Sequence, residues 1–377
     1  GCFTLFRELS TGLEYIRSSR DLCDSGFYTD LHAYQCRVFL DVREVQDGED
    51  RGYARLAGEL EGRGVPSLEI ALRELRFRPA RTAFRDLADP DLFRRILAVR
   101  ITLPGGTPDP GLPGEVEGKA HALLSVIRQH AGGKGDERRI AGEIRSRVEA
   151  LLQLPVAGDL PSGSPSPDYS SAIHDLLSGL ERQPSRWGLL LGWLLAEGIE
   201  EMRTGGEAER AGRIGIEEWG MDTVLCDALR GLGRDEAGAD RDMAVIGFLV
   251  RHPEWWKKAK RAEDAPGRLL RSLAEEEGVR RILGFNRYQE TLYLGKEALE
   301  DFLEDLLAAA AVHLGARSAA ADARGEEDLP RRLAACREAV RALRGVAERA
   351  GYRVETMLEI TVPAPETGPA PSGPPDP

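Results

Sequence analysis

One segment of the chain, residues 26–45, carries a clear β-strand pattern in a sequence whose other periodic segments are helical. From Tyr34 to Arg43, successive side chains alternate between two sets, which is the two-residue period of a strand. A strand needs partners for its backbone N–H and C=O groups, and the sequence offers one weak candidate for a second strand, at 352–362. We therefore expect the sheet to be completed by other polypeptide, in a chain that begins partway through a larger protein.

The remaining segments predict a mainly α fold. Apolar residues from Tyr53 to Leu60 recur at the spacing of one helix face. Ser67 is placed to cap a second helix, which we expect Pro79 to end. The most apolar stretch, 187–199, is too short to span a bilayer and predicts a buried helix that Ser185 can cap.

Composition shifts at two linkers and at the proline-rich end divide the chain into segments. The predicted division is a β remnant at 1–50, a helical segment at 51–102, a linker at 103–114, a helical hairpin at 115–154, a linker at 155–167, a helical domain at 168–352, and a short strand with a disordered proline-rich tail at 353–377. The chain therefore reads as one or more helical domains that follow a short β segment.

Charge and composition exclude several kinds of partner. The net charge is −12 at pH 7, which argues against nucleic acid and against an anionic membrane. The 5 cysteines contain no CxxC pair, and the 6 histidines have no HxxxH or HxH spacing. We therefore predict no metal, no cofactor and a reducing, cytoplasmic location.

Two local patterns suggest chemistry but favour structural readings. Gly132 to Gly135, with Lys134, resembles a phosphate loop, yet the GxxxxGK(S/T) pattern fails, since Lys134 is followed by Gly135 and Asp136, and no strand precedes it. Asp30 and His32 would share one strand face and could do acid–base work, but no nucleophile accompanies them. We expect a solvated turn in the first case and a structural hydrogen bond in the second, and we predict no catalytic residue.

Polar and aromatic side chains gather in two places where a ligand could bind. They are Asn286, Arg287, Tyr288, Lys296 and Glu297 in a loop between apolar helices, and the adjacent Trp255 and Trp256. Adjacent tryptophans on a helix point about 100° apart, so one would pack in the core and the other could form a platform for a sugar ring. The structural alternative, which we favour, is that Asn286 caps a helix, Lys296 and Glu297 open the next one, and the aromatic rings pack.

Three phrases of the sequence resemble large bacterial proteins of the α-amylase family (glycoside hydrolase family 13-like) that carry a long C-terminal extension. The phrases are GFYTDLHAYQCRVFLDVREVQD, RGVPSLEIALRELRFRPARTAFRDL and FNRYQETLYLGKEALEDFL, and the likeness covers residues 20–100 and, more loosely, 180–315. In that family the first phrase follows the catalytic (β/α)8 barrel, inside a small β domain. Tyr293, Leu294 and Gly295 depart from the more aromatic and polar triplet that the family has before the Lys-Glu helix start.

The resemblance implies a parent protein that acts on α-glucans by a retaining mechanism with two carboxylates. Those carboxylates would lie upstream of Gly1, so no catalytic residue can be placed on this chain. The hypothesis is then a non-catalytic C-terminal accessory region, with the upstream barrel and an α-glucan as its partners and its oligomeric state left open. One alternative is an autonomous helical scaffold that binds another protein. Another is a sugar-binding module that uses Trp255, Trp256 or Tyr288.

Overall fold

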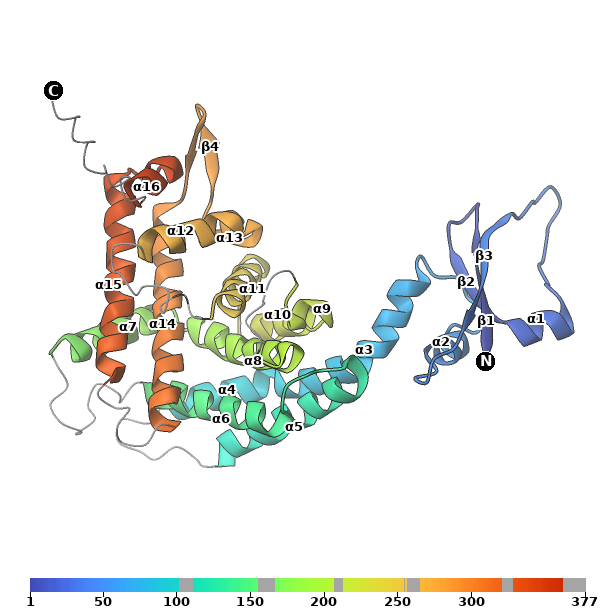
Figure 1. Cartoon of the computed structure of the whole chain (residues 1–377), viewed down its shortest axis with the longest axis horizontal. Coiled ribbons are helices and arrows are strands. Elements are labelled where there is room, and N and C mark those ends of the chain that lie inside the picture. The colour runs from blue at the N-terminus through green and yellow to red at the C-terminus, as the bar shows by residue number, and fades with distance from the viewer. Residues whose placement is uncertain are drawn as a thin grey trace, which may run out of the picture.

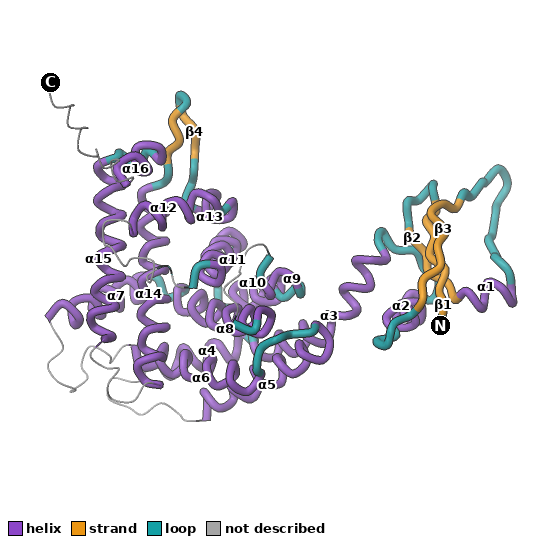
Figure 2. The backbone as a smooth tube through the Cα atoms, in the orientation of Figure 1, coloured by secondary structure: helices purple, strands orange, loops and turns teal. Residues whose placement is uncertain are grey.

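The protein is mainly helical, as the sequence predicts (Figure 1). The computed structural model describes residues 1–101, 111–154, 167–206, 213–253, 255, 265–320 and 328–361. A small β domain forms the N-terminal end, and a long helix leads from it into a larger helical body (Figure 2). No helix in the described ranges is both long and apolar enough to cross a bilayer.

The β domain holds a three-stranded antiparallel sheet with a helix on one face. Its elements are β1 (Cys2–Glu8), β2 (Glu14–Ser18), α1 (Ser19–Ser25), β3 (Phe39–Gln46) and α2 (Gly52–Leu60). The strand order is β2-β1-β3, so Leu5 of the central strand lies opposite Ile16 on one side and Arg43 on the other. The expectation that other polypeptide must complete the sheet is therefore wrong, because the first eighteen residues supply both other strands: β1 pairs with β3, and β2 pairs with β1.

The predicted strand at 26–45 is also too long at its start. β3 begins at Phe39, and residues 26–38 form a loop. Within the loop the Gln35 N–H donates to the His32 carbonyl at 3.0 Å, and Tyr34 adopts a left-handed φ of 65°. Because of this turn, residues 26–38 do not continue the strand, although the two-residue alternation of apolar and polar residues in the sequence extends across the turn.

A small separate core holds the β domain together. The buried side chains come from β1, β2, α2 and the first turns of the next helix, and they are Phe3, Leu5, Ile16, Leu56, Leu60, Leu68 and Leu75. Phe3 and Leu5 of β1 share one face of the sheet, and α2 covers that face. The opposite face carries the features described in the next subsection.

Helix α3 (Leu68–Leu87) connects the β domain to the helical body (Figure 1). The Ser67 hydroxyl accepts from the Ile70 N–H at 3.3 Å, which confirms the predicted cap. The helix continues through Pro79, so the prediction that Pro79 ends it is wrong. Ala80 and Phe84, just beyond the proline, are fully buried in the helical body, and this burial outweighs the backbone hydrogen bond that the proline removes.

The helical body contains α4 to α16 and one hairpin. Its elements are α4 (Pro90–Ile101), α5 (Gly111–Ala131), α6 (Glu137–Gln153), α7 (Pro167–Arg182), α8 (Arg186–Thr204), α9 (Gly215–Glu218), α10 (Asp222–Gly231), α11 (Glu236–Arg251), α12 (Ala265–Glu275), α13 (Glu277–Ile282), β4 (Asn286–Tyr288), β5 (Thr291–Tyr293), α14 (Lys296–Ala320), α15 (Asp328–Arg349) and α16 (Val354–Thr361). One continuous buried cluster runs from Ala80 to Met357. The helical hairpin at 115–154 and the segment at 168–352 therefore share a core with α3 and α4 and are not separate domains.

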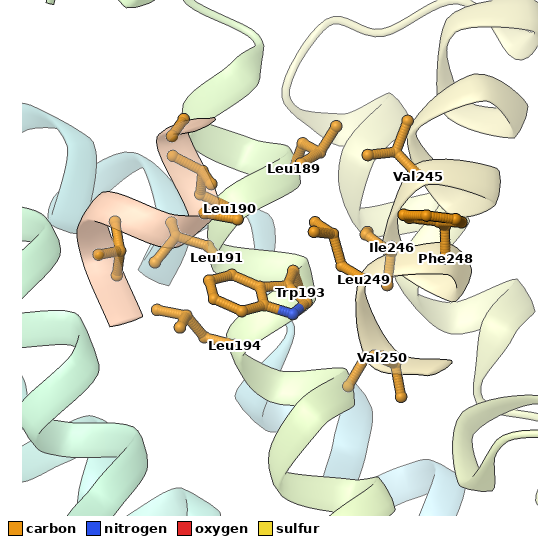
Figure 3. Close-up of a cluster of buried hydrophobic side chains, with 14 of the residues drawn as sticks. Leu189, Leu190, Leu191, Trp193, Leu194, Val245, Ile246, Phe248, Leu249 and Val250 are labelled. Carbon is orange, nitrogen blue, oxygen red and sulfur yellow. The ribbon is translucent and has the colours of Figure 1, made fainter. Parts of the chain in front are cut away.

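Helix α8 forms the centre of this body. The apolar stretch 187–199 is buried along its whole length, as the sequence predicts, although the Ser185 side chain makes no capping hydrogen bond. Trp193 lies between leucines of α8 and Leu249 of α11 (Figure 3). Because large apolar side chains on several faces of α8 are buried, the other helices are arranged around it.

The last predicted strand, within 353–377, is a helix. Val354, Met357 and Thr361 are buried on one side of α16, with the spacing of three and four residues that is typical of one helix face. An isolated bridge between Tyr293 and Arg353 is the one β interaction described there. Three parts of the predicted segments lie outside the described residues: 362–377 of the tail, 103–110 of the first linker and 155–166 of the second linker. Residues 111–114, predicted as the end of the first linker, belong instead to α5.

Candidate functional site

Exposed apolar side chains gather on the loop that precedes β3 and on β3 itself. We call this group the 27–42 surface; its members are Phe27, Tyr28, Leu31, Tyr34, Val38, Leu40 and Val42. Tyr28 is 88% exposed and Val42 is 64% exposed. A contiguous group of large apolar side chains in water marks an interaction site more often than scattered ones do.

An aromatic cluster holds the loop against the open face of the sheet. Phe6 of β1 stacks on Tyr15 of β2 with 5.5 Å between ring centroids, and Phe27 meets both Phe6 at 5.2 Å and Phe39 at 4.7 Å. A cavity of about 370 Å³ lies beside these rings, and Arg37 is among its lining residues. The packed rings therefore hold the loop in place, and the loop carries those residues of the 27–42 surface that precede β3.

Strand β3 lies at the edge of the sheet. It pairs with β1 on one side, and no described residue pairs with its other side. A bulge interrupts its pairing between Leu5 and Arg7; there Asp41 has a φ of 55° and forms an ion pair with Arg7. Bulges and charged side chains limit edge-to-edge pairing with other strands.

The buried carboxylate of Glu8 connects several side chains on the same open face of the sheet. Glu8 is 4% exposed and accepts hydrogen bonds from the Thr11 hydroxyl at 2.9 Å, the Ser10 hydroxyl at 3.0 Å and the Tyr15 hydroxyl at 3.2 Å. Its Oε1 also lies 3.6 Å from Nε of Arg37 in the loop. The hydrogen bond from Thr11 is the main cause that lowers the pKa of Glu8 below its ordinary value.

The predicted binding residues 286–297 lie at the far end of the molecule, on the β4–β5 hairpin and the start of α14 (Figure 1). Asn286, Arg287 and Tyr288 are exposed on β4, and Tyr288 is 63% exposed. Lys296 and Glu297 open α14, in agreement with the structural alternative, whereas Asn286 pairs with Tyr293 and caps no helix. The hairpin therefore exposes one aromatic ring and one cation, which point to opposite faces because they are successive residues of β4.

The other candidate site residues from the sequence differ in where they lie in the structure. Trp255 is 7% exposed and belongs to the core, and Trp256 lies outside the described residues. Asp30 and His32 are exposed in the loop and do not share a strand face, so that expectation is wrong. His32 instead donates from its backbone N–H to Oε1 of Gln35 at 3.1 Å.

The glycine-rich turn at 132–135 is a packing element. The N–H groups of Lys134 and Gly135 both donate to the Met202 carbonyl at the end of α8, at 2.8 and 3.0 Å. Gly135 is buried, so this turn is less solvated than the sequence suggests. Because these two N–H groups are already satisfied, they do not form a phosphate cradle.

A groove of about 790 Å³ between α10, α11 and α13 is lined in part by Glu217, Arg251 and Glu276, and His252 contacts Glu276 from outside its lining. Nε2 of His252 lies 3.0 Å from Oε1 of Glu276, and Arg251 donates to both Glu276 and Glu217 at 2.8 Å. The groove also contains Cys226, but burial raises the pKa of its thiol, which opposes formation of the nucleophilic thiolate. The ionic contacts therefore join helices, and Cys226 is not activated as a nucleophile.

Sequence reasoning missed a buried ionic network in the helical body. Arg186 of α8 contacts Asp301, Glu304 and Asp305 of α14, and Arg241 of α11 contacts Asp305. In the sequence these residues resemble the ordinary solvated charges of amphipathic helices, and no sequence signal distinguishes buried charges from exposed ones. In the part of the chain that the structure describes, no group of three His, Cys, Asp or Glu side chains is arranged to hold a metal ion.

Comparison of the chain with protein-family models, with curated proteins and with solved structures gave no match.

Proposed function

We propose that this chain is a non-catalytic accessory region whose β domain docks onto another folded domain. The observation that carries the proposal is the 27–42 surface, with its exposed apolar side chains next to an edge strand. The residues of this surface belong to the phrase that resembles α-amylase-family proteins, where it directly follows the catalytic barrel. The domain we propose as the partner is therefore an upstream (β/α)8 barrel that acts on α-glucans.

The energetics support docking of this surface onto a preformed partner. Burial of one large apolar side chain is worth about 1.5 to 3 kcal/mol, so a few of these residues contribute as much as a typical domain interface needs. The aromatic cluster already holds the loop, which reduces the conformational entropy that docking would cost. The edge strand and the ion pair between Arg7 and Asp41 supply polar groups that can fix the orientation.

Hydrogen exchange tests this proposal directly. We would compare the 377-residue chain with the protein expressed from the whole reading frame that encodes it. The backbone amides of residues 27–42 should exchange quickly in the former and become protected in the latter. A double variant, Tyr28→Ser and Val42→Ser, should lose that protection, whereas Ile70→Ser, which removes an exposed apolar side chain outside the surface, should keep it.

Two results would reject the proposed function. One is a reading frame without a (β/α)8 barrel, which would leave a helical scaffold that binds a separate protein as the better reading. The other is equal exchange of residues 27–42 in both proteins.

The same proposal includes contact of the helical body with α-glucan at the β4–β5 hairpin. Tyr288 is the exposed aromatic ring there, and Arg287 is the adjacent exposed cation. Titration with maltoheptaose, followed by NMR, should shift the Tyr288 ring resonances, and Tyr288→Ala should abolish saturable binding. Tyr34→Ala, which removes an exposed tyrosine in the β domain, should leave binding unchanged; a flat titration of the unmodified chain would remove the hairpin from the proposal.

A further inference from the structure

A cavity between α7, α14 and α15 is lined mainly by arginines and leucines, in a protein whose net charge is −12. The three helices lie side by side in the helical body (Figure 1), and the cavity has a volume of about 310 Å³. The charged residues that line it are Arg182, Arg186, Arg337, Arg341, Arg344 and Glu304. Five cations and one carboxylate in one small cavity are a local reversal of the overall charge.

The arginines of α15 face the cavity because of their spacing. Arg337, Arg341 and Arg344 stand at positions i, i+4 and i+7, which fall on one side of a helix. Arg182, at the C-terminal end of α7, lines the cavity from the other side. Together with Arg186 of α8, the cations therefore reach the same space from three helices.

Glu304 of α14 shows where a negatively charged atom sits in this cavity. Its Oε2 accepts a short hydrogen bond from Arg186 at 2.6 Å. Its other oxygen, Oε1, lies 3.6 Å from an Nη2 atom of Arg182 and 3.7 Å from Nη2 of Arg344. These last distances are those of ion pairs without hydrogen bonds, so Oε1 accepts no hydrogen bond from Nη2 of either arginine, although Nε of Arg182 donates to the Ser178 carbonyl at 3.2 Å.

The partners of the other arginines show which donors remain for a ligand. Arg186 is 3% exposed and is engaged by α14 carboxylates, and Arg337 has a further interaction of its own. Arg341 pairs with Glu338 on the solvent side, where both are 60% exposed. In contrast, Nε of Arg344 is buried and has no hydrogen-bond partner among the described residues. Arg344 is therefore the residue whose donors most require an acceptor.

An apolar floor completes the cavity. Leu176 and Leu180 of α7, Leu307 of α14 and Val340 of α15 line it together with the arginines. Small-molecule sites combine an apolar lining with a few converging polar groups in cavities of about 300 to 1,000 Å³, and this cavity is at the lower end of that range.

We propose that this cavity binds a small organic phosphate. The phosphate group would lie between Arg182 and Arg344, next to Arg341, and the apolar part of the ligand would cover the leucine floor. A phosphate monoester has three terminal oxygens and can accept from several guanidinium groups at once, whereas one carboxylate is satisfied by a single fork of donors. Glu304 occupies part of the anion position through Oε1 and thus competes with the ligand.

Isothermal titration with phenyl phosphate tests the site, with benzoate, phenol and inorganic phosphate as comparison ligands. We expect one saturable site for phenyl phosphate, with affinity that falls as salt is added. Benzoate and inorganic phosphate should bind more weakly, since each lacks one part of the recognised chemistry, and phenol should not bind. Arg344→Gln should weaken binding of phenyl phosphate by about tenfold or more, because charge-assisted hydrogen bonds to phosphate are lost.

A matched control and a second variant make the test decisive. Arg349→Gln removes the same charge from an exposed position of α15 outside the cavity and should leave the affinity unchanged. Glu304→Gln removes the competing negative charge while Arg186 keeps its contacts with Asp301 and Asp305, so it should tighten binding. The proposal is wrong if phenyl phosphate shows no saturable binding, if Arg349→Gln weakens it as much as Arg344→Gln, or if Glu304→Gln leaves the affinity unchanged or lower.

Discussion

Arg186, at the start of α8, donates from Nε to Oδ1 of Asp305 on α14 at 2.9 Å, and both side chains are almost completely buried. Burial raises the pKa of Asp305, although the guanidinium groups of Arg241 and Arg186 act in the opposite direction. The pair joins two helices that are far apart in the sequence at the centre of the helical body. The stability of the folded protein therefore depends on a charged pair, Arg186 and Asp305, that is shielded from water.

The first prediction follows from this pair. Arg186→Met should destabilise the protein by about 3 to 5 kcal/mol, because it leaves buried carboxylates with fewer partners. Arg182→Gln is the matched control: its side chain is 70% exposed and its contact with Glu304 is 3.6 Å long, so the loss should stay below about 1 kcal/mol. Urea denaturation followed by circular dichroism measures both, and equal midpoints would contradict the prediction.

The second prediction concerns the turn at 132–135. A Cβ atom at Gly135 would lie 2.9 Å from the Glu201 carbonyl oxygen and 3.0 Å from Cα of Met202, which are backbone atoms that cannot easily move. Gly135→Ala should therefore destabilise the helical body by about 1 to 3 kcal/mol. Gly118→Ala, in α5 with nothing within 4 Å of the new atom, should stabilise it by about 0.5 to 1 kcal/mol. Thermal unfolding should thus shift in opposite directions, and a shift of the same sign would refute the packing argument.

The third prediction concerns the proline inside α3. Pro79 cannot donate to the Leu75 carbonyl, yet the helix continues. Pro79→Ala should restore that hydrogen bond and stabilise the protein by about 1 to 3 kcal/mol. Arg85→Ala, at an exposed position of the same helix, should change stability by less than about 0.5 kcal/mol. A destabilised Pro79→Ala protein would mean that the proline ring makes packing contacts worth more than the missing hydrogen bond.

The fourth prediction is a pH dependence of the β domain. Hydrogen bonds from Thr11, Ser10 and Tyr15 lower the pKa of Glu8 in the folded state, so the carboxylate form is stabilised by folding. A lowered folded-state pKa gives stability that is present above the unfolded value, ordinarily 4.5, and is lost as the pH falls through the folded value. Denaturation of the sheet, followed by near-ultraviolet circular dichroism of its aromatic cluster, should show this loss.

Glu8→Gln provides the control for that titration. The variant should be less stable at neutral pH, and its stability should depend less on pH in the acidic range, because the titrating group is absent. An unchanged acid profile would assign the pH dependence to another carboxylate.

Sequence patterns identified many helices correctly but misjudged how they combine. The period of 187–199 predicted α8, and Ser67 marked the start of α3, because both depend on contacts within a few residues. The predicted segments at 115–154 and 168–352 do not have a core each, since one core runs from Ala80 to Met357. A linker-like composition reports local backbone preference and contains no information on which helices pack together.

The candidate sites show the same limit. Trp255 and Tyr288 looked equally available in the sequence, yet the first is 7% exposed and the second 63%. The alternation from Tyr34 to Arg43 predicted one continuous strand, but the structure puts a left-handed turn at Tyr34 and begins β3 at Phe39. The sequence did not predict that the arginines of the cavity cluster, because they come from different turns of α15 and from other helices.

By itself the sequence determined that this protein is mainly helical, with a β segment near its start, because hydrophobic periods and caps act over one or two turns. The tertiary structure alone decided that β1 and β2 complete the sheet of β3, that α3 continues through Pro79, and that Arg186 meets Asp305. These outcomes depend on burial and pairing between residues far apart in the chain, and the free energy of such contacts outweighs local preference.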